Sequence, residues 1–177
     1  MNSCTHLLGL ESYPSRIEYN GRLISVSICP MGINPDDFEM TEPVRRAMSK
    51  LKSHHRFKGR KIIVTIDKLD ICKGMPLKLL ALESLLERYP QWVNKVILFT
   101  IVRDDRTRGR GSDKDLRKAV NALVGRVNGK FGCADYCPIV YVKRVLPRNE
   151  IIALQALADV ALVSSLREGV SLGAMEF

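Results

Sequence analysis

Two carboxylates close to the end of the chain, Glu168 and Glu176, lie on either side of a predicted junction between a strand, a loop and a helix. The apolar run 160–163 is typical of a buried strand, serine and glycine residues interrupt it, and residues 172–177 fit the first turn of a helix. Such a junction directs backbone N–H groups and the positive end of a helix dipole at a phosphate. Together with carboxylates that accept hydrogen bonds from hydroxyl groups, this arrangement suits a nucleotide sugar. Taken by itself, the stretch fits a purely structural junction equally well.

A second loop, residues 67–74, follows the predicted strand 61–66 and carries two lysines. Lys68 and Lys73 stand just beyond the strand end, where their point charges can hold a diphosphate, and Gly74 lets the backbone come close. A solvated turn is the alternative interpretation, because most loop lysines have no ligand.

A third loop, residues 103–113, is rich in arginine and glycine. A guanidinium group suits phosphate, although a mobile surface loop or an RNA contact also fits this composition. Basic groups on two loops and carboxylates on another make an anionic, hydroxyl-bearing small molecule the most economical ligand. The arginines concerned are Arg103, Arg106, Arg108 and Arg110.

Alternating strands and helices should bring these loops together. A turn at 19–22 leads into the first predicted strand, and the chain then alternates, which predicts an α/β protein with a doubly wound, mostly parallel sheet and ligand loops at the carboxyl ends of its strands. The predicted strands are 23–28, 61–66, 95–102, 138–142 and 159–163, and the predicted helices are 41–51, 76–89, 114–131 and 150–157.

Composition narrows the class of protein. With 177 residues and 46% hydrophobic content the chain should bury a core as one domain. The net charge of +9 invites a nucleic-acid ligand, but the few aromatic residues are scattered, so nucleic acid is disfavoured. A membrane span and a signal peptide are not expected, which predicts a cytoplasmic protein without membrane contact. The five cysteines show no repeated spacing, which favours reduced thiols over disulfides. Cys133 and Cys137 have no second cysteine pair or histidine nearby in the sequence to complete a metal site.

Several motifs, in order along the chain, resemble the trehalose-6-phosphate synthases. The resemblance implies a retaining glycosyltransferase of two facing Rossmann-like domains (the GT-B type) that moves glucose from UDP-glucose to glucose 6-phosphate, without a metal or another cofactor. The motifs are 8–11 (LGLE), 30–33 (PMGI), Lys68-Leu69-Asp70-x-x-Lys73-Gly74, 77–83 (LKLLALE), 89–96 (YPQWVNKV), 124–132 (VGRVNGKFG), and 158–163 (ADVALV) with Glu176-Phe177.

The resemblance further implies that the chain is the C-terminal, donor-binding half of such an enzyme, truncated at its C-terminal end. Residues 1–35 would be the lead-in strand and interdomain connection, and 36–177 the nucleotide-sugar-binding domain. The implied partners are the missing N-terminal acceptor-binding domain and other synthase subunits. Because half of the cleft is absent, we expect the chain alone to be inactive.

Site residues follow from the resemblance position by position. Lys68 and Lys73 match cations on the donor diphosphate, Glu168 matches a carboxylate on the donor sugar, and Glu176 matches the glutamate on the ribose. These lysines and Glu168 form the expected catalytic set. Backbone groups at Ser171 and Leu172 would receive the phosphates, and Arg106, or Arg108 after a one-residue gap, would add a further donor-site cation.

Departures from the family pattern gather around the same site. Active synthases carry arginine, aspartate, methionine and asparagine where this chain has Lys68, Glu168, Val170 and Ser171. Lysine lacks the bidentate fork of arginine, and the longer glutamate can displace a hydroxyl contact. Stretches 70–74 and 108–111 look more like divergent synthase-like proteins. A non-catalytic regulatory subunit or nucleotide-sugar sensor is therefore the alternative function.

Overall fold

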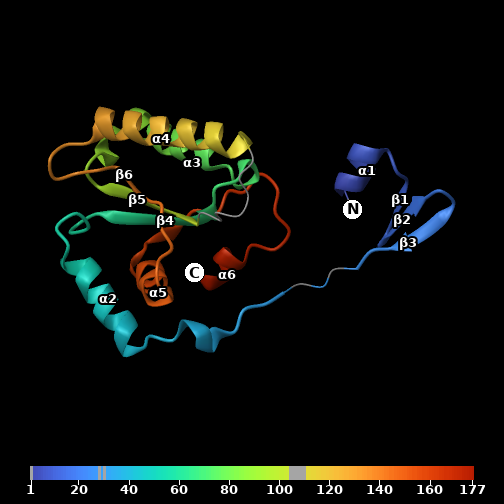
Figure 1. The fold of residues 1–177 in the computed structure, drawn as a ribbon, viewed down its shortest axis with the longest axis horizontal. Helices are drawn as coiled ribbons and strands as arrows, with labels where there is room; N and C mark the ends of the chain where they lie inside the picture. Colours follow the sequence, from blue (N-terminus) through green and yellow to red (C-terminus); the bar gives the residue numbers. More distant parts are fainter. Residues whose placement is uncertain (1, 28, 30, 104–110) are drawn as a thin grey trace. The chain divides into compact units, whose positions relative to one another are not determined.

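The computed structural model describes residues 2–27, 29, 31–103 and 111–177, in two compact units, Met1–Gly32 and Ile33–Phe177 (Figure 1). The first unit contains α1 (Asn2–Leu8) and an antiparallel sheet of β1 (Ser12–Tyr13), β2 (Arg16–Tyr19) and β3 (Arg22–Ser25). The predicted turn joins β2 to β3, with Asn20 and Gly21 at φ 50° and 72°, as a tight two-residue hairpin requires. The domain boundary predicted at residue 35, with the roles given to each part, stays a prediction.

The second unit is built on a four-stranded parallel sheet, which confirms the predicted fold class. Its strand order is β6 (Ile139–Val142), β5 (Val96–Arg103), β4 (Lys61–Lys68) and β7 (Val160–Ala161). Helices α3 (Met75–Arg88) and α4 (Gly111–Phe131) cover one face, and α2 (Glu42–Ser53) and α5 (Arg148–Leu157) cover the other (Figure 1). The sheet is therefore doubly wound.

A hydrophobic cluster lies on each face of this sheet. Leu79, Leu82 and Leu86 of α3 are buried against one face, as the spacing of leucines in the sequence predicts. Strand β5 is buried from Val96 to Val102, which explains its nearly continuous apolar sequence, because a central parallel strand is covered on both sides. The short elements η1 (Pro35–Phe38), η2 (Ile71–Lys73), η3 (Pro90–Trp92) and α6 (Leu172–Glu176) complete the unit.

Two strands differ from the prediction in ways that affect the ligand edge. β4 runs to Lys68, so Lys68 is the last residue of a strand and not a loop residue. β7 contains only Val160 and Ala161; directly before it, the Asp159 carboxylate accepts hydrogen bonds from Ile62 N at 2.8 Å and Lys61 Nζ at 2.6 Å. Among the described residues, no helix combines the length and apolar character that crossing a membrane requires.

Candidate functional site

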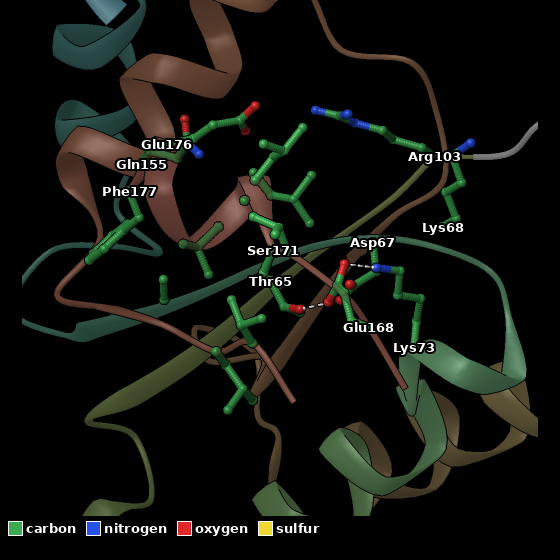
Figure 2. Close-up of a pocket in the computed structure, with 18 residues that line it drawn as sticks. Thr65, Asp67, Lys68, Lys73, Arg103, Gln155, Glu168, Ser171, Glu176 and Phe177 are labelled. Atoms are coloured by element: carbon green, nitrogen blue, oxygen red, sulfur yellow. Dashed lines mark hydrogen bonds and ion pairs between the residues drawn. The ribbon is translucent and has the colours of Figure 1, made fainter. Parts of the chain in front are cut away.

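The carboxyl ends of β4, β5 and β7 open into a pocket of about 300 Å³ (Figure 2). Residues from η2, from the loop after β7, and from α5 and α6 complete its wall. Every predicted binding residue that the structure describes lines this one pocket, whereas Arg106 and its alternative Arg108 fall outside the described residues. The pocket-lining members of the predicted set are Lys68, Lys73, Glu168, Ser171, Leu172 and Glu176.

Close backbone packing joins the Lys73 loop to the Glu168 loop. Leu166 N donates to Cys72 O at 2.7 Å, and Gly74, at φ 65°, lies so near that a Cβ atom there would be 3.0 Å from Ser164 O. Glycine satisfies both the left-handed backbone and the close approach. The loops that sequence reasoning treated as separate binding elements thus form one packed wall.

An ion pair spans the same two loops. Lys73 Nζ donates to Glu168 Oε1, and the side chains keep only 26% and 23% of their surface exposed (Figure 2). The hydrogen bond from Lys73, with a smaller effect of the nearby Ser165, lowers the pKa of the Glu168 carboxyl below its ordinary value. Glu168 is therefore ionised at neutral pH and partly neutralises Lys73. A phosphate that approaches Lys73 must share its ammonium group with Glu168.

A second pair of cations marks the rim of the pocket. Lys68 and Arg103 are register partners at the ends of β4 and β5, and both exposed side chains line the pocket. Arg103 extends toward the side where Glu176 lies (Figure 2). Like charges at paired positions repel each other, so a bound anion would relieve this arrangement. Sequence reasoning named Arg103 but selected Arg106 as the donor-site cation. The signal that favoured Arg103 was its position at the end of an apolar, buried strand.

At the opposite side of the pocket, α6 supplies Ser171 as its N-cap, Leu172 as its first residue and Glu176 as its last. Gln155 of α5 also lines the pocket; it is only 7% exposed, and its Oε1 has no hydrogen-bond partner among the described residues. Sequence reasoning missed Gln155, for which a polar residue inside an apolar helical run was the only signal.

Beneath the pocket lies a buried polar cluster that sequence reasoning also missed. Thr65 Oγ1 donates to Asp67 Oδ2 at 2.7 Å, and both residues line the pocket although they are 2% and 8% exposed. The sequence interpretation placed Asp67 at the start of the loop 67–74, whereas it is the penultimate residue of β4. Within the described part of the chain, no three histidine, cysteine or acidic side chains gather as metal ligands would.

A parallel α/β sheet with this pocket at its carboxyl edge defines a Rossmann-like protein. The chain belongs to glycosyltransferase family 20, which it matches over residues 1–177. It is 41% identical over 178 residues to alpha,alpha-trehalose-phosphate synthase (UDP-forming) 2 of Aspergillus fumigatus, covering 100% of this chain and 37% of that protein. It is 39% identical to the 56 kDa subunit of the Saccharomyces cerevisiae synthase, covering 100% of this chain and 36% of that subunit.

Solved structures of the family share the fold. The N-terminal domain of Candida albicans trehalose-6-phosphate phosphatase superposes with a TM-score of 0.81 at 29% identity, over 98% of this chain and 37% of that one. A synthase from Burkholderia vietnamiensis gives a TM-score of 0.79 at 26% identity, over 99% of this chain and 38% of that one. The sheet thus matches one Rossmann-like half of the GT-B fold.

These matches correct the predicted place of the chain within the family. It was expected to be the C-terminal half of a synthase. The chain instead spans about 37% of the Aspergillus synthase, and the Candida structure it matches is an N-terminal domain, that of a phosphatase. We therefore assign the chain to the family as a fragment and withdraw the assignment to a C-terminal half.

Proposed function

We propose that this chain is a fragment of a trehalose-6-phosphate synthase-like glucosyltransferase and that its pocket binds UDP-glucose. The observation that supports this most is the convergence, in one pocket, of cations from β4, β5 and η2 with carboxylates from the β7 loop and α6. The relatives' names supply the reaction class: a UDP-forming synthase of trehalose phosphate. The corresponding reaction is UDP-glucose plus glucose 6-phosphate to trehalose 6-phosphate plus UDP.

The charged side chains can be assigned to different parts of the ligand. Lys68, Lys73 and Arg103 would hold the diphosphate, since all three cations line the pocket at the strand ends or just beyond them. Glu176 would accept hydrogen bonds from the ribose, and Glu168 from the transferred sugar. As UDP leaves with retention of configuration, negative charge develops on the diphosphate, and the lysines stabilise it without a metal.

The fragment alone should bind without transferring glucose, because it spans only about 37% of the synthase that it resembles. A nucleotide-sugar sensor is the alternative function, and the Lys73–Glu168 ion pair favours it. The Glu168 carboxylate partly neutralises Lys73, the lysine proposed to hold the diphosphate. Less positive charge is then left to stabilise the departing UDP, and this loss slows turnover more than it weakens binding.

Amide NMR spectra recorded during titration with UDP test the proposal. We expect the shifts to concentrate at pocket residues, with Lys73, Ser171 and Leu172 among the most affected, and inorganic pyrophosphate to reproduce only the part near the cations. Shifts confined to other surfaces, or no shifts at millimolar UDP, would refute binding at this pocket. In a parallel assay, formation of trehalose 6-phosphate by the chain alone would contradict the inactivity of the fragment.

A further inference from the structure

Lys78 is a fully buried charge next to the pocket. It belongs to α3, and its side chain is 0% exposed, although lysine is almost never buried completely unless it is paired. Lys78 does not line the pocket itself. Any effect on a ligand must therefore act through the residues that Lys78 contacts.

Its ammonium group contacts three residues that do line the pocket. Lys78 Nζ lies 2.5 Å from Asp67 Oδ2, 3.0 Å from Thr65 Oγ1 and 3.5 Å from Leu162 O. Thr65 and Asp67 belong to β4, and Leu162 directly follows β7. One buried cation thus ties together α3 and the carboxyl ends of two neighbouring strands.

The pair also controls the charge beneath the pocket. Asp67 is 8% exposed, and without Lys78 its carboxylate would be a buried, uncompensated negative charge beside the space proposed for a diphosphate. Removing one member of a buried ion pair leaves the other member's field unscreened. The field of Lys78 reaches the pocket: it helps to lower the pKa of the Glu168 carboxyl, after the larger effects of Lys73 and Ser165.

We propose that Lys78 is a positioning residue of the anion site that acts through Asp67: its ammonium group cancels the charge of the Asp67 carboxylate beneath the pocket. This inference rests on the proposed function, because the anion concerned is the diphosphate of UDP. It adds a residue that touches no ligand and yet sets the affinity for one.

Three variants separate charge from packing. Lys78→Met keeps most of the side-chain volume and leaves the Asp67 carboxylate unpaired. Asp67→Asn leaves the Lys78 ammonium group unpaired, and the double variant Lys78→Met/Asp67→Asn removes both charges. The control is Glu83→Gln, which breaks a different ion pair of α3, between the buried Glu83 and the half-exposed Arg126 at 2.5 Å, away from the pocket lining.

Calorimetric titration with UDP and with uridine gives the first readout. Lys78→Met should weaken UDP on the order of tenfold, as expected for an uncompensated nearby charge, while uridine changes much less. The double variant should bind UDP within a few-fold of the parent, Asp67→Asn should bind UDP at least as tightly as the parent because the Lys78 charge is left uncompensated, and Glu83→Gln should change neither ligand. Equal losses for UDP and uridine in Lys78→Met, or a double variant that stays as weak as the single one, would overturn the proposal.

A ligand-free readout distinguishes failure of this inference from failure of the proposed function. In a carboxyl NMR titration, the pKa of Glu168 should rise in Lys78→Met and return toward the parent in the double variant. If the parent binds no UDP, the proposed function fails, whatever the carboxyl titration shows. If the parent binds UDP but Lys78→Met changes neither the UDP affinity nor the Glu168 titration, only the Lys78 inference fails. Should Lys78→Met not fold, the proposal requires that the neutral double variant folds and binds UDP.

Discussion

Lys73 donates a hydrogen bond to Glu168 across a separation of 95 residues in the sequence. The contact joins the cation proposed to hold the diphosphate with the carboxylate proposed to hold the sugar, so the two parts of the proposed donor site are coupled before any ligand binds. This coupling makes the effect of removing the carboxylate predictable in sign.

Glu168→Gln should tighten UDP binding and remove the preference for UDP-glucose over UDP. The amide leaves Lys73 with its full charge for the diphosphate, a gain of roughly two- to fivefold on the scale of a partly exposed ion pair, whereas the sugar loses a carboxylate acceptor. Calorimetry with both ligands measures the two effects. Glu87→Gln, which breaks the exposed Lys130–Glu87 pair of α3 and α4, is the control and should change neither affinity. Weaker UDP binding by Glu168→Gln would contradict the coupling.

The Lys73–Glu168 pair should also make stability depend on pH in the acid range. The folded-state pKa of Glu168 lies below its ordinary 4.5, so its stabilising contribution is complete above that value and is lost as pH falls through the lower, folded pKa. Thermal unfolding of the parent and Glu168→Gln between pH 7 and about pH 3 isolates this contribution, because the Asp159 carboxyl, whose pKa Lys61 lowers, titrates in both proteins. The stability difference should be constant near neutrality and shrink in acid; a difference that grows in acid would contradict the ion pair.

Gly74→Ala should separate the two packed loops. The new Cβ meets Ser164 O at 3.0 Å from a left-handed backbone position, so we expect a loss of roughly 1–3 kcal/mol in the free energy of unfolding. UDP should bind more weakly as well, because Lys73 and the Glu168 loop share this contact. Gly125→Ala is the matched control: Gly125 is exposed on α4 with open space around it, and the change should be neutral or stabilising. Denaturant unfolding checks both, and similar effects at the two glycines would contradict the packing argument.

Arg103→Gln should weaken UDP without weakening the fold. The variant removes one of two like charges at the ends of neighbouring strands, so thermal stability should stay the same or rise, while UDP loses a phosphate contact and uridine does not. The UDP affinity should also become less sensitive to salt. Arg88→Gln, at the exposed end of α3, serves as the control. Equal losses of UDP and uridine would show that Arg103 supports the pocket instead of binding the diphosphate.

Most of the second unit could be predicted from sequence because its signals are local. Apolar runs gave the parallel strands, leucine spacing gave α3, and shared motifs pointed to the residues that line the pocket. Contacts between distant segments could not be predicted. The burial of Lys78 is an example, because a lysine in a helical pattern indicates an exposed face. Its burial is stabilised by an ion pair with Asp67 of β4, a residue that lies outside the pattern of the helix.

The end of the chain shows the same limit. The apolar run 160–163 predicted a strand of that length, but β7 pairs with β4 only at Val160 and Ala161, and the hydrogen bond from Leu162 N to Val64 O at 2.8 Å follows it. Likewise, the sequence alone could not decide between Arg106 and Arg108, and both lie outside the described residues. Arg103 is at the pocket because it pairs in register with Lys68 at the ends of β5 and β4.

UDP titration of Lys73→Ala and Glu176→Gln, with uridine as the second ligand, tests the donor-site assignment most directly. Lys73 acts through charge, so its loss should weaken UDP more than uridine, with a difference that shrinks as salt rises. Glu176 is proposed to accept hydrogen bonds from the ribose, so Glu176→Gln should weaken both ligands about equally, by roughly 1–3 kcal/mol. If both variants bind UDP as tightly as the parent, the pocket is not the donor site and the shared sequence motifs report only the fold.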